Sequence, residues 1–158
     1  MQRRHFFPAL AALVSVPLSP RLFAHHGWSS FDETRPLYIA GIVKSSKWQN
    51  PHAEIVITVA NDVSLPADLA TRSPPAQTAS VNGAKILAAA TLPKKRGDWT
   101  IELSPMTRID AWKVPPPKVG DSVAAVAYSF KDETGAAFAR VEYLMIGDKI
   151  YGLRSSPA

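Results

Sequence analysis

The sequence predicts a small all-β protein, an OB-like, partly open antiparallel barrel of five or six strands with one long insertion. Three observations lead to this fold class. Short segments in which apolar and polar side chains alternate recur along the chain, and turn residues bound them. The first segment is long and contains a glycine, so it can serve both halves of a curved sheet. A single stretch rich in Ala, Pro and Ser interrupts the series. A two-sheet β-sandwich is the alternative.

Six segments carry the strand pattern, and in chain order they cover residues 37–44, 53–59, 98–103, 122–129, 137–146 and 149–153. Gly41 indicates a bend or bulge within the first strand. The chain turns after that strand at Asn50 and Pro51, because proline supplies no backbone donor and asparagine favours turns. Asp132 and Glu133 begin a turn before the fifth strand, and adjacent carboxylates of this kind do not predict an acid–base dyad.

The insertion covers about residues 61–97 and separates the second strand from the third. Its residues 81–91 contain good helix formers, including Ala84, Lys85 and Leu87. The same residues also fit a strand followed by a loop, so both interpretations remain open. A basic cluster at Lys94–Arg96, between a proline and a glycine, is expected to be a solvated loop.

Residues 1–24 are expected to be an export signal that is removed. Arg3 and Arg4 form a basic start, and the apolar run at residues 6–18 is shorter than the ~20 residues of a membrane-spanning helix. Ala24 offers a small residue at the cleavage site. The two arginines followed by apolar bulk also resemble the twin-arginine export signature. The sequence therefore predicts a single β-barrel domain at residues 25–158, without a membrane span, in the bacterial periplasm or secreted.

Composition and charge exclude several classes of function. The chain has 158 residues, 46% of them hydrophobic, and no cysteine, which excludes disulfides, thiolate metal sites, cysteine nucleophiles and c-type haem. The formal net charge is +5. Three basic residues and no acidic ones lie in the predicted signal, which leaves about +2 and predicts no nucleic-acid partner. No motif for nucleophilic, phosphoryl or hydrolytic chemistry is present, so the sequence does not predict an enzyme.

Several short motifs together resemble a known family. They are Ala24-His25-His26, Phe31-Asp32, Trp48-Gln49-Asn50-Pro51-His52, Trp99-Thr100-Ile101-Glu102 and Lys118-Val119-Gly120-Asp121. With these motifs the chain resembles a family of small exported bacterial proteins that carry a domain of unknown function. The Trp-x-Asn-Pro-His stretch is the most specific of them. The resemblance implies export and a compact β fold, and it implies no particular activity.

The candidate metal ligands are the three histidines of the processed chain: His25, His26 and His52. Cleavage after Ala24 would give His25 a free amine beside its imidazole, and these two nitrogens can chelate one ion. The His52 imidazole would complete a histidine brace, with His26 as an alternative or extra ligand. Such nitrogen ligation suits Cu(II). A reversal at Pro36 would let residues 25–36, ~40 Å long when extended, run back beside the first strand toward His52.

The leading hypothesis is therefore a periplasmic metal-binding protein for carriage or buffering, with copper as the expected cofactor and a periplasmic protein as the expected partner. The alternative is a metal-free OB-like binding module for a protein or oligosaccharide, with Trp48, Trp99 and Trp112 as stacking residues. A copper oxidase or oxygenase built on the same brace is a third hypothesis. In the simplest interpretation, the paired histidines belong to a leader and His52 caps a turn.

Overall fold

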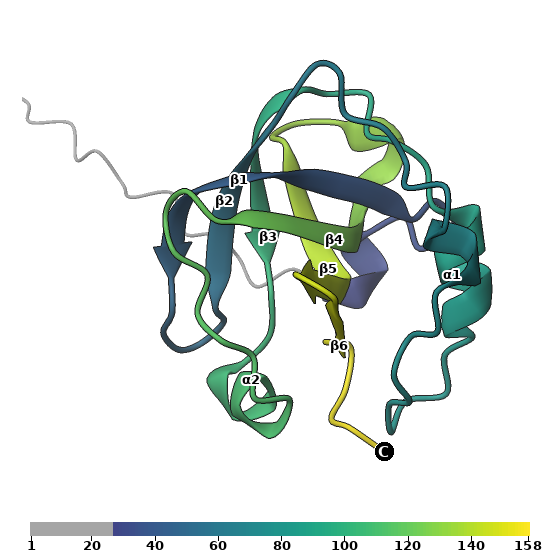
Figure 1. Ribbon diagram of the computed structural model, residues 1–158, viewed down its shortest axis with the longest axis vertical. Coiled ribbons are helices and arrows are strands. Elements are labelled where there is room, and N and C mark those ends of the chain that lie inside the picture. The colour runs from purple at the N-terminus through teal and green to yellow at the C-terminus, as the bar shows by residue number, and fades with distance from the viewer. Residues whose placement is uncertain (1–26) are drawn as a thin grey trace, which may run out of the picture.

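The computed structural model describes residues 27–158, which form a small barrel with an outer layer on one side (Figure 1). Its strands are β1 (Leu37–Lys47), β2 (Glu54–Val59), β3 (Gly97–Glu102), β4 (Ser122–Ser129), β5 (Phe138–Ile146) and β6 (Lys149–Gly152). Each predicted strand is present, with ends that differ by at most three residues. The predicted small OB-like all-β fold is confirmed.

Five strands close the barrel in the order β3-β2-β1-β4-β5, and β3 then pairs with β5. This closing contact is parallel and joins Thr100–Glu102 to Phe138–Arg140, whereas the other pairs are antiparallel. The barrel is therefore closed and mixed, where the sequence predicted a partly open antiparallel one. Alternating side chains do not show strand direction, which explains the difference. β6 extends the sheet beyond β5 as a hairpin.

Strand β1 belongs to both halves of the barrel, as its length predicts. Its first half pairs with β4 and its second half with β2, and Ile42 has partners on both sides. The register shift in the β1–β2 pair falls between Val43 and Ser45 rather than at Gly41. Gly41 has another role, because a Cβ there would lie 2.1 Å from the Thr58 carbonyl oxygen. Glycine thus permits the close approach of the two backbones.

The barrel interior is apolar and holds one main core. Side chains from all six strands contribute to it, together with Ile109 and Val114 from the segment that follows β3. Trp99 is fully buried in this core. At ~25 cal/mol per Å² of buried apolar surface, this interior supplies the main favourable term for folding.

A second apolar cluster lies on the outer face of the barrel and is covered by the insertion. The insertion contains the 3-10 turn η2 (Leu69–Thr71) and the helix α1 (Gly83–Ala89), so the helical interpretation of residues 81–91 is confirmed. The Asn82 side chain caps α1 by accepting a hydrogen bond from the Lys85 N–H at 3.0 Å. The cluster consists of Tyr38, Leu69, Leu87, Ala90, Val126, Tyr143 and Met145. Figure 1 shows α1 beside the barrel.

One helix, α2 (Met106–Ala111), was not predicted from the sequence. It follows β3 directly, buries Ile109 against the core, and has only six residues, too few for a clear periodic pattern. The Ser104 hydroxyl and the Arg108 guanidinium both donate to the Leu153 carbonyl, and this holds the end of the chain beside α2. No helix among residues 27–158 is long and apolar enough to span a membrane.

The close approach at Gly41 gives a stability prediction. Gly41→Ala is expected to lower the free energy of unfolding by about 2–3 kcal/mol, because the new Cβ displaces backbone rather than a flexible side chain. Urea denaturation followed by circular dichroism measures this change. The control is Gly27→Ala, whose Cβ would meet only Ser29 Oγ at 3.6 Å. Equal stabilities of the two variants would contradict the steric explanation.

Candidate functional site at the His52 end of the barrel

His52 lies in the connection between β1 and β2, at one end of the barrel. The Ala53 N–H donates to the Ser104 carbonyl at 3.0 Å, and the Ala53 carbonyl accepts from the Leu103 N–H at 2.8 Å. The β2–β3 ladder therefore extends beyond Glu54. Ala53 is fully buried, and side chains alternate along an extended chain, so His52 and Glu54 lie on the outer face. His52 is half-buried there.

Charged side chains form a row across the outer face of this barrel end. Glu54 and Glu102 are opposite each other in the β2–β3 pair, and Arg140 is opposite Glu102 in the β3–β5 pair. Arg140 Nε donates to Glu102 Oε1 at 2.7 Å. The Arg140 guanidinium also lies over the Trp28 ring, with 5.3 Å from Cζ to the ring centroid. The row thus leads from the strand that follows His52 to the first described helical turn, η1 (Trp28–Ser30).

The segment at residues 27–36, here called the strap, runs back along the barrel from Pro36. Phe31 stacks on Phe138 with 6.1 Å between centroids, and the Asp32 N–H donates to the Ser129 carbonyl at 2.9 Å. Arg140 lies two residues after Phe138 on β5, and its guanidinium contacts the Trp28 ring. The strap therefore follows the outer face of β5, whereas the sequence analysis expected it to run beside β1. Phe138 and Arg140 supply the stacking surface on β5, whereas the outer face of β1 at Lys44–Lys47 is exposed and polar.

The structure describes one of the three predicted metal ligands and not the other two. His25 and His26 lie outside the described residues, as do the predicted signal at residues 1–24 and its cleavage site. His52 is described. Within residues 27–158, no three His, Cys, Asp or Glu side chains are grouped so that they could hold a metal ion. The metal site thus remains a prediction whose outcome depends on the two N-terminal histidines.

Trp99 is not part of an exposed tryptophan face for stacking a ligand. Trp99 is fully buried in the main core, and its indole N–H donates to the Lys95 carbonyl at 3.3 Å. Trp112 is partly buried and donates to the Ser155 carbonyl at 2.8 Å, and Trp48 packs against the main core. The stacking prediction was therefore wrong for Trp99, whereas Trp48 and Trp112 are partly exposed and their stacking role stays a prediction. Strand alternation already placed Trp99 on the same face as Ile101 and Leu103.

A buried charged cluster, which the sequence interpretation missed, joins β5 to the end of the chain. Glu142 is fully buried, and its carboxylate accepts from Arg154 Nε at 2.6 Å and from Gln77 Nε2 at 3.2 Å. Burial raises the pKa of Glu142, and the Arg154 and Gln77 contacts oppose this shift. Arg140 and Glu142 are charged residues in a strand whose other side chains are apolar or aromatic. Charged residues within such a strand are the sequence signal for a buried cluster.

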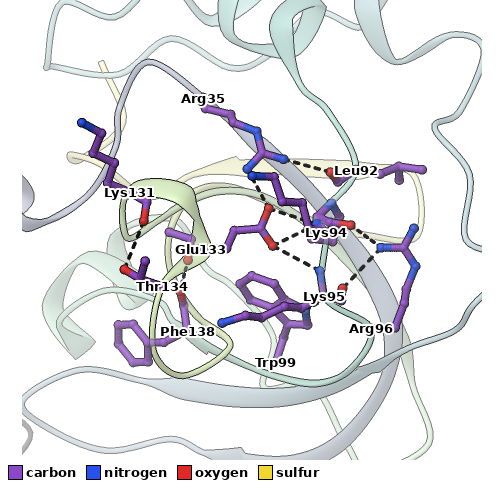
Figure 2. Close-up of polar contacts among 12 residues, drawn as sticks. Arg35, Leu92, Lys94, Lys95, Arg96, Trp99, Lys131, Glu133, Thr134 and Phe138 are labelled. Carbon is purple, nitrogen blue, oxygen red and sulfur yellow. Dashed lines mark hydrogen bonds and ion pairs between the residues drawn. The ribbon is translucent and has the colours of Figure 1, made fainter.

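A second missed carboxylate is Glu133, within the 3-10 turn η3 (Lys131–Glu133). Its carboxylate accepts from Arg35 Nη1 at 2.6 Å, from the Lys94 N–H at 2.9 and 3.0 Å, and from the Lys95 N–H at 3.2 Å (Figure 2). Burial alone would raise the pKa of Glu133, but these donors outweigh it and hold the pKa below its ordinary value. The expected solvated loop at residues 94–96 is instead bound to a buried acid through its backbone.

Comparison with known proteins identifies one similarity. The model of a family of unknown function, DUF6152, matches residues 12–69, a stretch that contains His25, His26 and His52. The resemblance to a family without a known function is thereby confirmed. No curated protein and no solved structure matches the chain significantly.

The environment of Glu133 predicts a pH-dependent contribution to stability. Glu133→Gln is expected to lower the free energy of unfolding at pH 7 by about 2 kcal/mol, because several donors lose a charged acceptor. The folded pKa lies below the ordinary value of 4.5, so the contribution is complete above pH 4.5. It is lost as the pH falls through the folded pKa. Urea denaturation of both proteins between pH 7 and pH 3 measures the difference.

The neighbouring Asp132→Asn provides the matched control, because Asp132 is exposed. Its effect is expected to stay within about 0.5 kcal/mol at every pH. A difference between wild type and Glu133→Gln that does not shrink in acid would contradict the assignment.

Proposed function

We propose that the protein is an exported metal-binding protein that carries or buffers copper in the periplasm. In this proposal His25 begins the processed chain and contributes its amine and imidazole nitrogens. His52 contributes the second imidazole, and His26 is an additional ligand. A periplasmic protein would deliver the metal or receive it.

The position of the strap is the observation that carries this proposal. Trp28, three residues after His25, lies against Arg140 at the same barrel end as His52. From Arg140 to His52 the backbone separation is about 12 Å, given two strand spacings of ~4.8 Å and two residues along β2. Three residues reach about 10 Å, and the two imidazoles add their own length. The two lengths are comparable, which supports a site shared by His25 and His52.

The type of donor, rather than the surrounding charge, favours a metal cation at His52. Glu54 shares its outer face and lies between Glu102 and Lys47 in the sheet. Arg140 pairs with Glu102, so this row of four charged side chains carries no net charge. Amine and imidazole nitrogens are borderline donors, and their affinity for divalent metals peaks at Cu(II).

A Cu(II) titration of the exported protein, with its N-terminus checked by intact mass, tests the site. We expect a one-to-one complex with a nitrogen-rich axial EPR spectrum. His52→Ala, or one residue added before His25, should weaken binding at least about tenfold, because each removes a ligand or the chelating amine. His26→Ala should have a smaller effect.

Gln49→Ala is the matched control, since Gln49 is exposed in the same connection and has no imidazole. It should bind copper as the wild type does. Binding that survives both His52→Ala and the N-terminal extension would refute the proposal.

A further inference from the structure

A pocket of about 550 Å³ lies between the strap, α1 and the barrel, and His52 is not among the residues that line it. The charged and the larger apolar groups of its lining come from Glu33, Pro36, Lys85, Ile86, Tyr128 and Arg154. The volume falls in the range of small-molecule sites. The lining combines two cationic groups with apolar side chains, a combination that suits an anionic ligand with an apolar body.

The Arg154 guanidinium is held rigidly at the edge of this pocket. Its Nε donates to Glu142 at 2.6 Å, and Gln77 in turn holds Glu142. The Trp28 ring lies against the guanidinium, with 4.0 Å from Cζ to the centroid. A buried ion pair adds little net stability compared with apolar packing, but it fixes the orientation of its members. Arg154 is thus oriented before any ligand arrives.

A carboxylate of the protein already occupies the outer side of Arg154. Glu33 Oε2 accepts from Arg154 Nη2 at 2.6 Å. The Glu33 side chain is 42% exposed, whereas that of Glu142 is fully buried. An exposed ion pair is weak and is exchanged readily. Glu33 therefore marks where another carboxylate can bind and is itself replaceable.

The charges around Arg154 set the charge of the ligand. Arg154 and exposed Lys85 carry two positive charges, and Glu33 and Glu142 carry two negative charges. A ligand that takes the place of Glu33 on Arg154 keeps this balance there if it carries one negative charge. Burial raises the pKa of Tyr128, with a smaller contribution from Glu142, so its hydroxyl remains protonated at neutral pH. Pro36 and Ile86 provide apolar surface for the rest of the ligand.

We propose that this pocket binds a small organic monocarboxylate with an apolar body, whose carboxylate replaces Glu33 on Arg154. Glu33→Gln should then tighten binding, because the internal competitor loses its charge. Lys85→Gln should weaken binding. Changes of about three- to fivefold are expected from the strength of exposed ion pairs.

Benzoate is the probe, and titration into the purified protein at constant ionic strength, followed by NMR amide shifts, measures its binding. The expected result is saturable shifts around Lys85 and Ile86, with tighter binding by Glu33→Gln and weaker binding by Lys85→Gln. Benzamide, which has the same ring and no charge, should not bind. Lys118→Gln, an exposed lysine outside the pocket, should bind benzoate as the wild type does.

Several results would overturn the proposal: benzamide binding as well as benzoate, Glu33→Gln without effect, or shifts that map elsewhere. Equal competition by inorganic phosphate would overturn the assignment to a carboxylate. His52→Ala should leave benzoate binding unchanged, so this site is tested independently of the copper proposal.

Discussion

The parallel pairing of β3 with β5 is the contact on which the arrangement of the molecule depends, although it joins only Thr100–Glu102 to Phe138–Arg140. It closes the barrel, and it also sets the register between two strands that are distant in sequence. Because of that register, Glu102 lies between Glu54 and Arg140, and a line of charge crosses the end of the barrel. A register shifted by one residue would turn these side chains inward and bring core residues to the surface.

Closure also explains the outer layer. Strand β5 has neighbours on both edges, and its outward side chains include aromatic and charged groups that require cover, such as Phe138, Arg140 and Glu142. The strap covers the first part of this face, and the insertion with the chain end covers the rest. Each covering segment brings a charged or polar partner: Glu33, Gln77 and Arg154. The candidate sites lie where this layer meets the barrel.

Much of the fold could be predicted from local patterns, because alternation and turn residues are properties of single strands. The strand at residues 122–129 was predicted with its observed ends. Strand direction and long-range pairing could not be predicted, since Thr100 meets Phe138 only in the closed barrel. For the same reason Glu133 and Glu142 were missed, because their partners come from distant segments. His52 could be singled out because histidine beside a turn motif is a local signal.

The stacking of Trp28 on Arg154 has an optical consequence. The strap contains a single tryptophan, and its indole lies against two guanidinium groups at the protein surface. Trp99, in contrast, is enclosed by the main core and changes its surroundings only when the barrel opens. Two of the four tryptophans of the chain, Trp28 and Trp99, therefore lie in different settings. Emission from Trp28 reports whether the strap is docked, and emission from Trp99 reports whether the barrel is folded.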